Sequence, residues 1–353
     1  MRGRDQGLDR FILSVLLHIL PEDGLGGVEV AARRSALAAP DVVTVAALGG
    51  AAPPARERIV RFGERSPLSP VAAWRAGGAA RGFPVAAFSL WKSILAMLAC
   101  AIRSPGTRRV LFLHSDRRVH LADSLATALA VPLSHEIWAD SRTSIEGLPA
   151  ARRRKTVVIS FLTRRFAGLR RTSPRPRFIF WGRLTPLKRI DRAIDLFARI
   201  AEARPDASLL LIGPDDGCEV ALKAQVAALG LEDKVTFAGP MDHDAIAAVA
   251  PEHDFFIQLS KQEGAAMSLI EAMQLGLAPV VTPVGEMPRY VSHMERGVIY
   301  ETEAQAAADV LRLLEEPELF ARISGEAIDH WAGRRLYEED VVAAARDLAR
   351  REV

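Results

Sequence analysis

Two glutamates, Glu263 and Glu271, have seven residues between them in the segment SKQEGAAMSLIEAMQLG (260–276). The apolar run 254–260 is typical of a buried strand, and 267–276 has the apolar spacing of a helix that a glycine closes. Glu263 is therefore expected in the strand-to-helix loop and Glu271 on the helix. Because a carboxylate accepts hydrogen bonds through both oxygens, the pair suits the vicinal hydroxyls of a sugar.

The corner between the two glutamates contains only residues with little or no side chain, namely Gly264, Ala265 and Ala266. The helix expected from Met267 would leave its first N–H groups unpaired, and such groups attract anions. A ligand with hydroxyls at both ends and phosphate in the middle is a nucleotide-sugar. The alternative interpretation is a capping box formed by Ser260 and Glu263, with Glu271 as a solvated helix residue.

A second candidate element is basic. The segment FIFWGRLTPLKR (178–189) is typical of a strand that runs into a turn, and this turn carries Arg183 and Lys188. Arginine binds phosphate through two parallel N–H groups, and lysine supplies a mobile point charge. Both residues would lie at the carboxyl end of the first strand of the second half, where parallel sheets bind ligands. A basic turn on the surface is the alternative interpretation.

A glycine turn, GLGGVE (24–29), follows the first apolar run of the chain. It does not match the dinucleotide fingerprint GxGxxG. Gly26 and Gly27 would still allow a ligand to approach the backbone closely.

Taken together, these elements resemble the family-4 retaining glycosyltransferases, which have the GT-B fold. The two glutamates match that family's E-x7-E element, EAMQLGLAPVVTPVGEMP (271–288) matches the stretch that follows it, and WGRLTPLKR matches its G-R-L-x-x-x-K element. The strand turns LIGPDDG (211–217) and VTFAGPM (235–241) follow in the same order. The resemblance is continuous over 178–300, whereas the first half matches at GLGGVE, the strand layout and 156–166.

The resemblance implies a role for each matched residue. Arg183, Lys188 and Glu263 would form the catalytic group, in which the two cations hold the donor diphosphate and Glu263 holds the hexose near the reacting carbon. The ribose would bind Glu271. The remaining donor contacts would come from the amides of Ala265, Ala266 and Met267, from Gly264, and from Gly26 and Gly27. The implied chemistry is transfer to an acceptor hydroxyl with retention, using a nucleotide-diphospho-sugar and neither metal nor cofactor.

A histidine is the one expected residue whose position stays open. The family commonly has one at the end of the strand that we align with 132–138, where this chain has Trp138. His114 and His135 are candidates for a polar contact with the sugar. The segment between 138 and 156 is also shorter than in the family, so the acceptor-binding part is abridged. A nucleotide-sugar epimerase, or a non-catalytic partner in a glycan-assembly complex, therefore remains an alternative.

Alternation of short apolar runs with amphipathic segments predicts an α/β fold of two tandem doubly wound, Rossmann-like domains that face a central cleft, and the resemblance implies that this is the GT-B fold. The domains are expected at 1–170 and 171–330, with 331–353 as a helix that packs back on the first. The segment 166–177, basic and proline-containing, is the predicted linker. We also expect a loop over 63–86 and a helix over 86–103.

The chain's net charge of +3 conceals an uneven distribution. Residues 1–176 hold 27 basic and 13 acidic residues, and the remainder holds 19 basic and 30 acidic residues. The basic half fits a glycan or lipid-linked acceptor and contact with the inner surface of the cytoplasmic membrane. No nucleic-acid-binding module accompanies the basic run 152–155, so nucleic acid is not expected as a partner. The two cysteines form no framework or metal pattern, which favours a cytoplasmic location.

Overall fold

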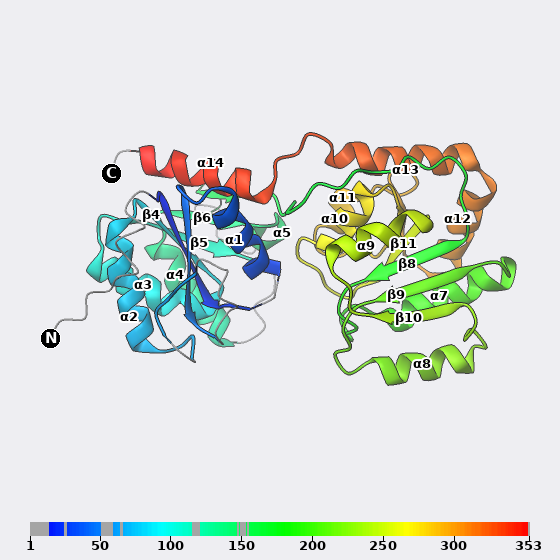
Figure 1. Ribbon diagram of the computed structural model, residues 1–353, viewed down its shortest axis with the longest axis horizontal. Coiled ribbons are helices and arrows are strands. Elements are labelled where there is room, and N and C mark those ends of the chain that lie inside the picture. Colours follow the sequence, from blue (N-terminus) through cyan, green and yellow to red (C-terminus); the bar gives the residue numbers. More distant parts are fainter. Residues whose placement is uncertain are drawn as a thin grey trace. The chain divides into compact units, whose positions relative to one another are not determined.

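The computed structural model describes residues 14–24, 27–50, 59–63, 66–114, 121–146, 148, 153 and 155–351, with side chains omitted at 121–123. The chain divides into two compact units. The first comprises Met1–Thr163 with Arg335–Val353, and the second comprises Arg164–Arg334. Each unit is built on one parallel sheet with helices on both faces (Figure 1), which confirms the predicted fold class.

The first unit contains, within the described residues, a seven-stranded sheet in the order β3-β2-β1-β4-β5-β6-β7. Its strands are β1 (Leu16–Glu22), β2 (Val43–Gly49), β3 (Ile59–Arg61), β4 (Val85–Ser89), β5 (Arg108–Leu113), β6 (Glu136–Ala139) and β7 (Thr156–Val158). The strand order reverses between β1 and β4, and such a reversal marks where parallel sheets bind ligands.

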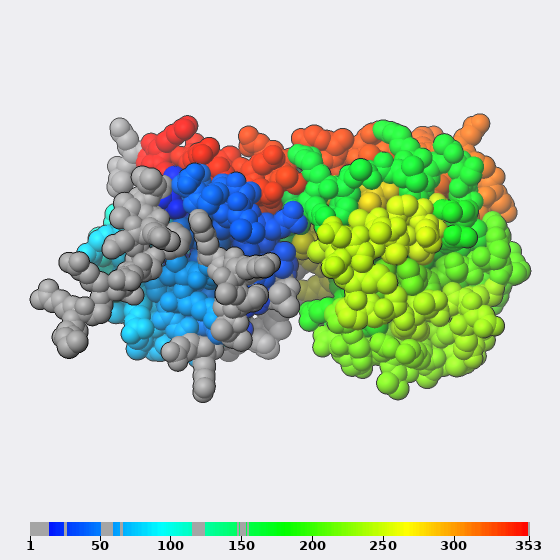
Figure 2. Space-filling model, in the orientation of Figure 1, coloured from blue at the N-terminus to red at the C-terminus, as the bar shows by residue number. Residues whose placement is uncertain are grey.

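Helices cover both faces of this sheet. One face packs on α2 (Pro70–Ala79), α3 (Ile94–Arg103) and α4 (Leu121–Leu133), whose buried residues share one core with alternate residues of the strands. On the other face, α1 (Gly27–Ala38) and α14 (Tyr337–Arg350) lie side by side, dark blue and red in Figures 1 and 2. The sheet is therefore buried on both sides, as its near-continuous apolar strands require.

The segment 63–103 differs from its prediction. The expected loop contains α2, and the expected helix is divided between β4 and α3. Ser69 caps α2 through the amide of Ala72, and Pro70 occupies its first position, where the missing N–H costs nothing. The alanine-rich composition hid this helix, because alanine supplies too little contrast for an apolar face to be recognised.

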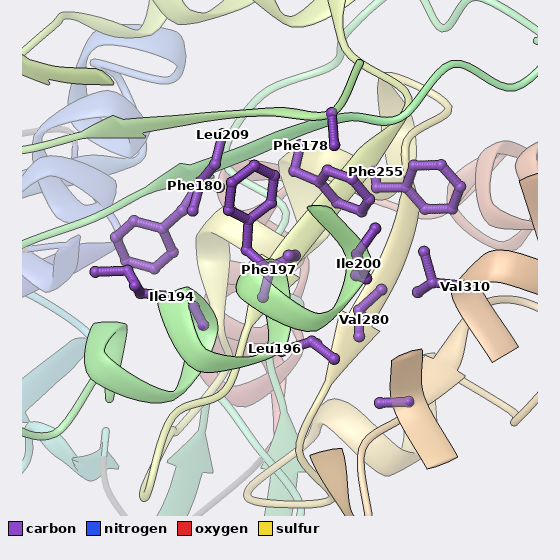
Figure 3. Close-up of a cluster of buried hydrophobic side chains, with 14 of the residues drawn as sticks. Phe178, Phe180, Ile194, Leu196, Phe197, Ile200, Leu209, Phe255, Val280 and Val310 are labelled. Carbon is purple, nitrogen blue, oxygen red and sulfur yellow. The ribbon is translucent and has the colours of Figure 1, made fainter. Parts of the chain in front are cut away.

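The second unit contains a six-stranded sheet of described residues in the order β10-β9-β8-β11-β12-β13. Its strands are β8 (Arg177–Trp181), β9 (Ser208–Ile212), β10 (Val235–Gly239), β11 (Phe255–Gln258), β12 (Ala278–Val281) and β13 (Val298–Ile299). The helices are α7 (Ile190–Ala203), α8 (Glu219–Ala228), α9 (His243–Val249), α10 (Met267–Gln274), α11 (Met287–Tyr290), α12 (Glu303–Glu315) and α13 (Pro317–Trp331). Strand phenylalanines pack on α7 in the core, as Figure 3 shows for Phe178, Phe180 and Phe197.

The predicted linker 166–177 is part of the second unit, so the boundary expected at 170 lies inside that unit. Arg171, in its middle, is buried and ion-paired with Asp254 at 3.0 Å. The chain returns to the first unit at Arg335, and α14 follows. Among the described residues, no helix is long and apolar enough to cross a bilayer.

Candidate functional site

The turns that follow β8, β9 and β10 are neighbours at the carboxyl edge of the second sheet and are joined by backbone hydrogen bonds. The Gly182 amide donates to Ile212 at 2.9 Å, and the Gly213 amide donates to Gly239 at 2.9 Å. Gly213 has a φ of +151°, and a Cβ there would lie 1.9 Å from the Gly182 carbonyl oxygen. Only glycine fits this position, and the result is a backbone surface at the edge where ligands bind.

Glu263 and Lys188 meet at this edge. Lys188 Nζ lies 2.6 Å from Glu263 Oε1, and the side chains are 22% and 10% exposed. The two loops are joined by the backbone, because the Lys261 amide donates to the Leu187 carbonyl at 2.8 Å. The parallel sheet places β8 beside β11, so the loops that follow these strands must be neighbours. Two of the three residues predicted as catalytic, Lys188 and Glu263, therefore form one ion pair in the structure.

Two further donors bind the same carboxylate oxygen. Gln258 Nε2 and Ser260 Oγ each lie 2.6 Å from Glu263 Oε1. Within the described part of the chain, Glu263 Oε2 has no hydrogen-bond partner. One oxygen therefore fixes the carboxylate, while the other remains an acceptor for a ligand hydroxyl.

Gln258 is a site residue that the sequence analysis missed. It ends β11, is fully buried, and its Oε1 accepts a hydrogen bond from Ser268 Oγ at 3.1 Å. Because Ser268 donates to the amide oxygen, the amide nitrogen must point to Glu263. A glutamine at the end of the apolar strand DFFIQLS was the available signal, since a buried amide requires partners.

Glu271 is held by two side chains that were also missed. Trp181 Nε1 donates to Oε2 at 2.9 Å, and His243 Nδ1 lies 3.1 Å from Oε1. The Glu271 side chain is 7% exposed, so it is not the solvated residue of the alternative interpretation. Each carboxylate oxygen still has a second lone pair with which to accept a hydroxyl.

The corner between the glutamates is confined by backbone. Ala265 and Ala266 are buried, and α10 begins at Met267 after Ala266 adopts a left-handed conformation. The other side of the corner is formed by Gly285, where a Cβ would lie 2.1 Å from the Glu263 carbonyl oxygen. Among the described residues no side chain caps α10.

The capping-box alternative is therefore wrong, because Ser260 binds the Glu263 carboxylate and α10 starts several residues later. Ser260 is fully engaged with Glu263, and the unpaired N–H groups at the start of α10 retain their capacity to bind an anion.

Arg183 does not join the Glu263 cluster. Its side chain is 71% exposed and pairs with Asp216 at 3.3 Å. The residue follows Gly182 in the turn after β8, so it lies at the same edge of the sheet as Lys188. An exposed guanidinium with a weak, solvated partner can exchange that partner for a phosphate at small cost.

The candidates in the first unit are divided between opposite edges of its sheet. His114 follows β5 at the carboxyl edge. His135 precedes β6, and its Nδ1 accepts the Arg109 amide at 3.0 Å near the amino end of β5. His135 therefore lies at the amino edge of the sheet, whereas parallel sheets bind ligands at the carboxyl edge, so the geometry favours His114 over His135 as a candidate for the sugar contact. Gly27 is the first residue of α1, and Gly26 lies outside the described residues.

His114 belongs to a buried hydrogen-bonded chain. Its Nδ1 lies 3.3 Å from Asp140 Oδ2, its Nε2 lies 3.0 Å from Ser89 Oγ, and Ser89 Oγ lies 2.7 Å from His18 Nε2. Asp140 accepts from Nδ1–H, so His114 Nε2 accepts the Ser89 hydroxyl, and Ser89 accepts from His18. The His114 side chain is only 2% exposed. Its hydrogen bonds fix the orientation of the His114 ring, and burial shields the ring from solvent.

Burial lowers the pKa of His18 to about 3, with the nearby His114 as a second cause. No partner for His18 Nδ1 exists in the described residues, so a second proton there would be buried without an acceptor. His18 therefore stays neutral in the folded protein, whereas it protonates below about pH 6.5 in the unfolded chain.

This difference predicts a pH-dependent loss of stability. The unfolded state binds the extra proton between about pH 6.5 and pH 3, so the free energy of unfolding falls as pH falls through that window. His18→Gln keeps a donor toward Ser89 and removes the titration. The wild type should lose about 2 kcal/mol more than this variant between pH 7 and pH 5. Urea denaturation at both pH values measures the difference.

The matched control is His293→Gln, because the side chain of His293 is 46% exposed. Its stability should follow pH as the wild type does. Burial also lowers the pKa of His135, His253 and His330, so only the difference between variant and wild type is diagnostic. Parallel pH curves for the wild type and His18→Gln would contradict the prediction.

Part of the chain is similar in sequence to known proteins. Residues 164–330 match the family model described as glycosyl transferases group 1. A GDP-mannose:cellobiosyl-diphosphopolyprenol alpha-mannosyltransferase of Xanthomonas oryzae pv. oryzae is 28% identical over 152 residues, which are 42% of this chain and 40% of that protein. An N-acetyl-alpha-D-glucosaminyl L-malate synthase of Bacillus anthracis is 33% identical over 144 residues, 40% of this chain and 36% of that protein.

Similarity of structure extends further than similarity of sequence. The Anabaena protein HepE in complex with UDP has a TM-score of 0.76 and 19% identity, covering 95% of this chain and 99% of that one. At that identity the comparison shows the fold, for both units. The sequence matches span less than half of the length of these curated relatives.

Proposed function

We propose that the protein is a glycosyltransferase, because residues 164–330 match the family model of the glycosyl transferases group 1. It moves a hexose from a nucleotide-diphospho-sugar to an acceptor hydroxyl, with retention of configuration and without a metal. The observation that carries the proposal is the Glu263 carboxylate, fixed through one oxygen by Lys188, Gln258 and Ser260 and unpartnered at the other among the described residues.

Different residues of the second unit bind different parts of the donor. Lys188 and Arg183 offer cations to the diphosphate, and the start of α10 offers N–H groups. Glu271, held between Trp181 and His243, accepts the ribose hydroxyls. Glu263 Oε2 accepts a hexose hydroxyl. Charge on the departing nucleotide is stabilised by the Lys188 ammonium and by the exposed Arg183 guanidinium.

For the acceptor, we propose a glycan or a lipid-linked glycan at the inner surface of the cytoplasmic membrane. Its support is the basic first half of the chain and the name of the Xanthomonas relative, which specifies a diphosphopolyprenol acceptor. This acceptor would serve the synthesis of a bacterial surface glycan or glycolipid.

A direct test combines binding with turnover. Thermal-shift measurements with UDP, GDP, ADP and their sugars should identify one nucleotide that stabilises the protein. That nucleotide-sugar should then be consumed, with EDTA present, when an extract of lipid-linked glycans is added. Stabilisation without turnover in any acceptor mixture would overturn the enzymatic proposal and favour a non-catalytic partner. Interconversion of the sugar without acceptor would identify an epimerase.

Gln258 should act as a positioning residue for Glu263. Gln258→Leu removes a donor from Oε1 and leaves Ser268 without its acceptor, so turnover should fall about 10- to 100-fold. The KM for the nucleotide-sugar should change about threefold or less, because Lys188 and Arg183 still bind the diphosphate. Initial-rate kinetics separate the two parameters.

Ser268→Ala is the matched control, because it removes the bond to Gln258 Oε1 and keeps the Nε2 contact with Glu263. This variant should retain most of the wild-type kcat. Equal losses in both variants would show that Gln258 supports only the fold.

A further inference from the structure

Exposed apolar side chains gather on the outward sides of α2, α3 and α4. Val71 and Trp74 on α2 are 59% and 49% exposed, and Ile102 on α3 is 70% exposed. We call this surface the outer helical face, and its large exposed apolar residues are Leu68, Val71, Trp74, Leu95, Ile102, Leu125 and Leu129. Segment 66–103, which forms much of it, is light blue to cyan in Figure 2.

The three helices lie side by side, so the face is continuous. A Cβ at Gly77 of α2 would lie 2.5 Å from the backbone of Ala99 of α3, which shows how closely these helices pack. Arg103 NH1 donates to the Trp74 carbonyl at 2.6 Å, and its guanidinium lies 4.9 Å from the centre of the Trp74 ring. On its other side α3 packs on α4.

The segment that carries α2 and α3 has charges of one sign. Residues 66–114 hold six basic residues and no acidic residue. Arg75 and Arg81 are exposed, and in the described part of the chain neither they nor Arg103 forms an ion pair. These arginine charges lie beside the apolar residues, and α2 and α3 contain no carboxylate that could neutralise them.

We propose that the outer helical face binds the surface of an anionic lipid bilayer. Tryptophan and aliphatic side chains enter the boundary between headgroups and acyl chains, and arginines beside them bind anionic headgroups. This inference rests on the proposed function in one respect, since a lipid-linked acceptor is the reason for an enzyme to be at a membrane.

A second copy of the chain fits the face less well. Isologous packing of α2 and α3 would bring the same arginines of two copies together, and like charges across an interface are unfavourable. Anionic lipid supplies both the apolar interior and the opposite charge that this surface lacks.

Vesicle binding tests the proposal without requiring turnover. The full chain is sedimented with vesicles of phosphatidylcholine, or of phosphatidylcholine with 30% phosphatidylglycerol, at about 50 and 500 mM NaCl. Binding should be at least about tenfold stronger to the anionic vesicles at low salt and should weaken at high salt. Trp74 fluorescence, obtained as the difference between wild type and Trp74→Phe, should shift to the blue and resist iodide quenching when vesicles are bound.

Double substitutions test whether vesicle binding depends on the outer helical face or is non-specific adsorption. Val71→Ser with Ile102→Ser, and separately Arg75→Glu with Arg81→Glu, should weaken binding about tenfold or more. Leu37→Ser with Val220→Ser is the control, because those exposed residues lie on α1 and α8, and binding should be unchanged. All variants should show the wild-type thermal shift with nucleotide, so a failed donor assay and a failed membrane assay are distinguishable.

Three outcomes would overturn the proposal. These are equal binding to neutral vesicles, unchanged binding by both pairs of face variants, and a stable dimer by light scattering that the Val71 and Ile102 substitutions dissociate.

Discussion

Glu263→Gln is expected to lower turnover about 100- to 1000-fold, with the affinity for the nucleotide nearly unchanged. Glutamine keeps the length of the side chain and an oxygen to face Lys188, Gln258 and Ser260. It removes the negative charge that balances Lys188 and replaces the free acceptor oxygen with an NH2 donor. A hexose hydroxyl that donates to Oε2 would then meet another donor.

The kinetic signature separates this role from simple binding. An interaction made mainly in the transition state lowers kcat and kcat/KM equally, whereas loss of uniform binding raises KM alone. For Glu263→Gln we expect a fall in kcat, and the Kd of the nucleoside diphosphate by calorimetry should stay within about threefold of the wild type.

Glu271→Gln is the matched comparison. It makes the same substitution on α10, directly after the loop that carries Glu263, and it removes the carboxylate proposed to bind the ribose. It should weaken nucleotide binding about tenfold, since hydrogen bonds to a charged group contribute about 1.5–3 kcal/mol, and should affect kcat less. If Glu263→Gln had wild-type turnover, or if both variants weakened only nucleotide binding, the role proposed for Glu263 would be wrong.

The proximity of Glu263 and Lys188 could be predicted, because the topology of a parallel sheet determines which loops are neighbours. Residues that follow parallel strands lie at one edge, and local sequence alone puts each of these residues just after a strand. The partners that hold the glutamates were not predictable in this way. Gln258, Trp181 and His243 come from different elements, and their orientation toward a carboxylate depends on packing that no spacing records.

The histidine shows a different limit. Two neighbouring strands, β5 and β6, both carry a nearby histidine, and sequence spacing led us to align the family's histidine with the second. The structure favours His114, because His135 precedes its strand and His114 follows the strand beside it, at the carboxyl edge of the sheet. The segment 166–177 was misread for the opposite reason: its composition is that of a linker, and one buried arginine fixes it to the second unit.

That arginine gives the second large prediction. Arg171 donates through its guanidinium to Asp254 and to the carbonyls of His253, Leu275, Ala250 and Leu169, at distances from 2.8 to 3.1 Å. Burial lowers its pKa, and Asp254 opposes that effect. Arg171→Met removes one of the two ion-pair partners of the buried Asp254, which keeps Arg175 at 2.8 Å, and it leaves the carbonyls of His253, Leu275 and Leu169 without this donor. The free energy of unfolding should fall by about 3–5 kcal/mol.

The adjacent residue provides the control. Arg170 pairs with Asp329, but the two side chains are 60% and 50% exposed, and an exposed ion pair contributes little to stability. Arg170→Met should therefore shift the urea midpoint little, whereas Arg171→Met shifts it strongly, and Arg171→Lys should be intermediate because it keeps the charge but not the fork. A flexible linker would tolerate both methionine substitutions equally. Equal midpoints for the two variants would therefore restore the linker that the composition of this segment predicts.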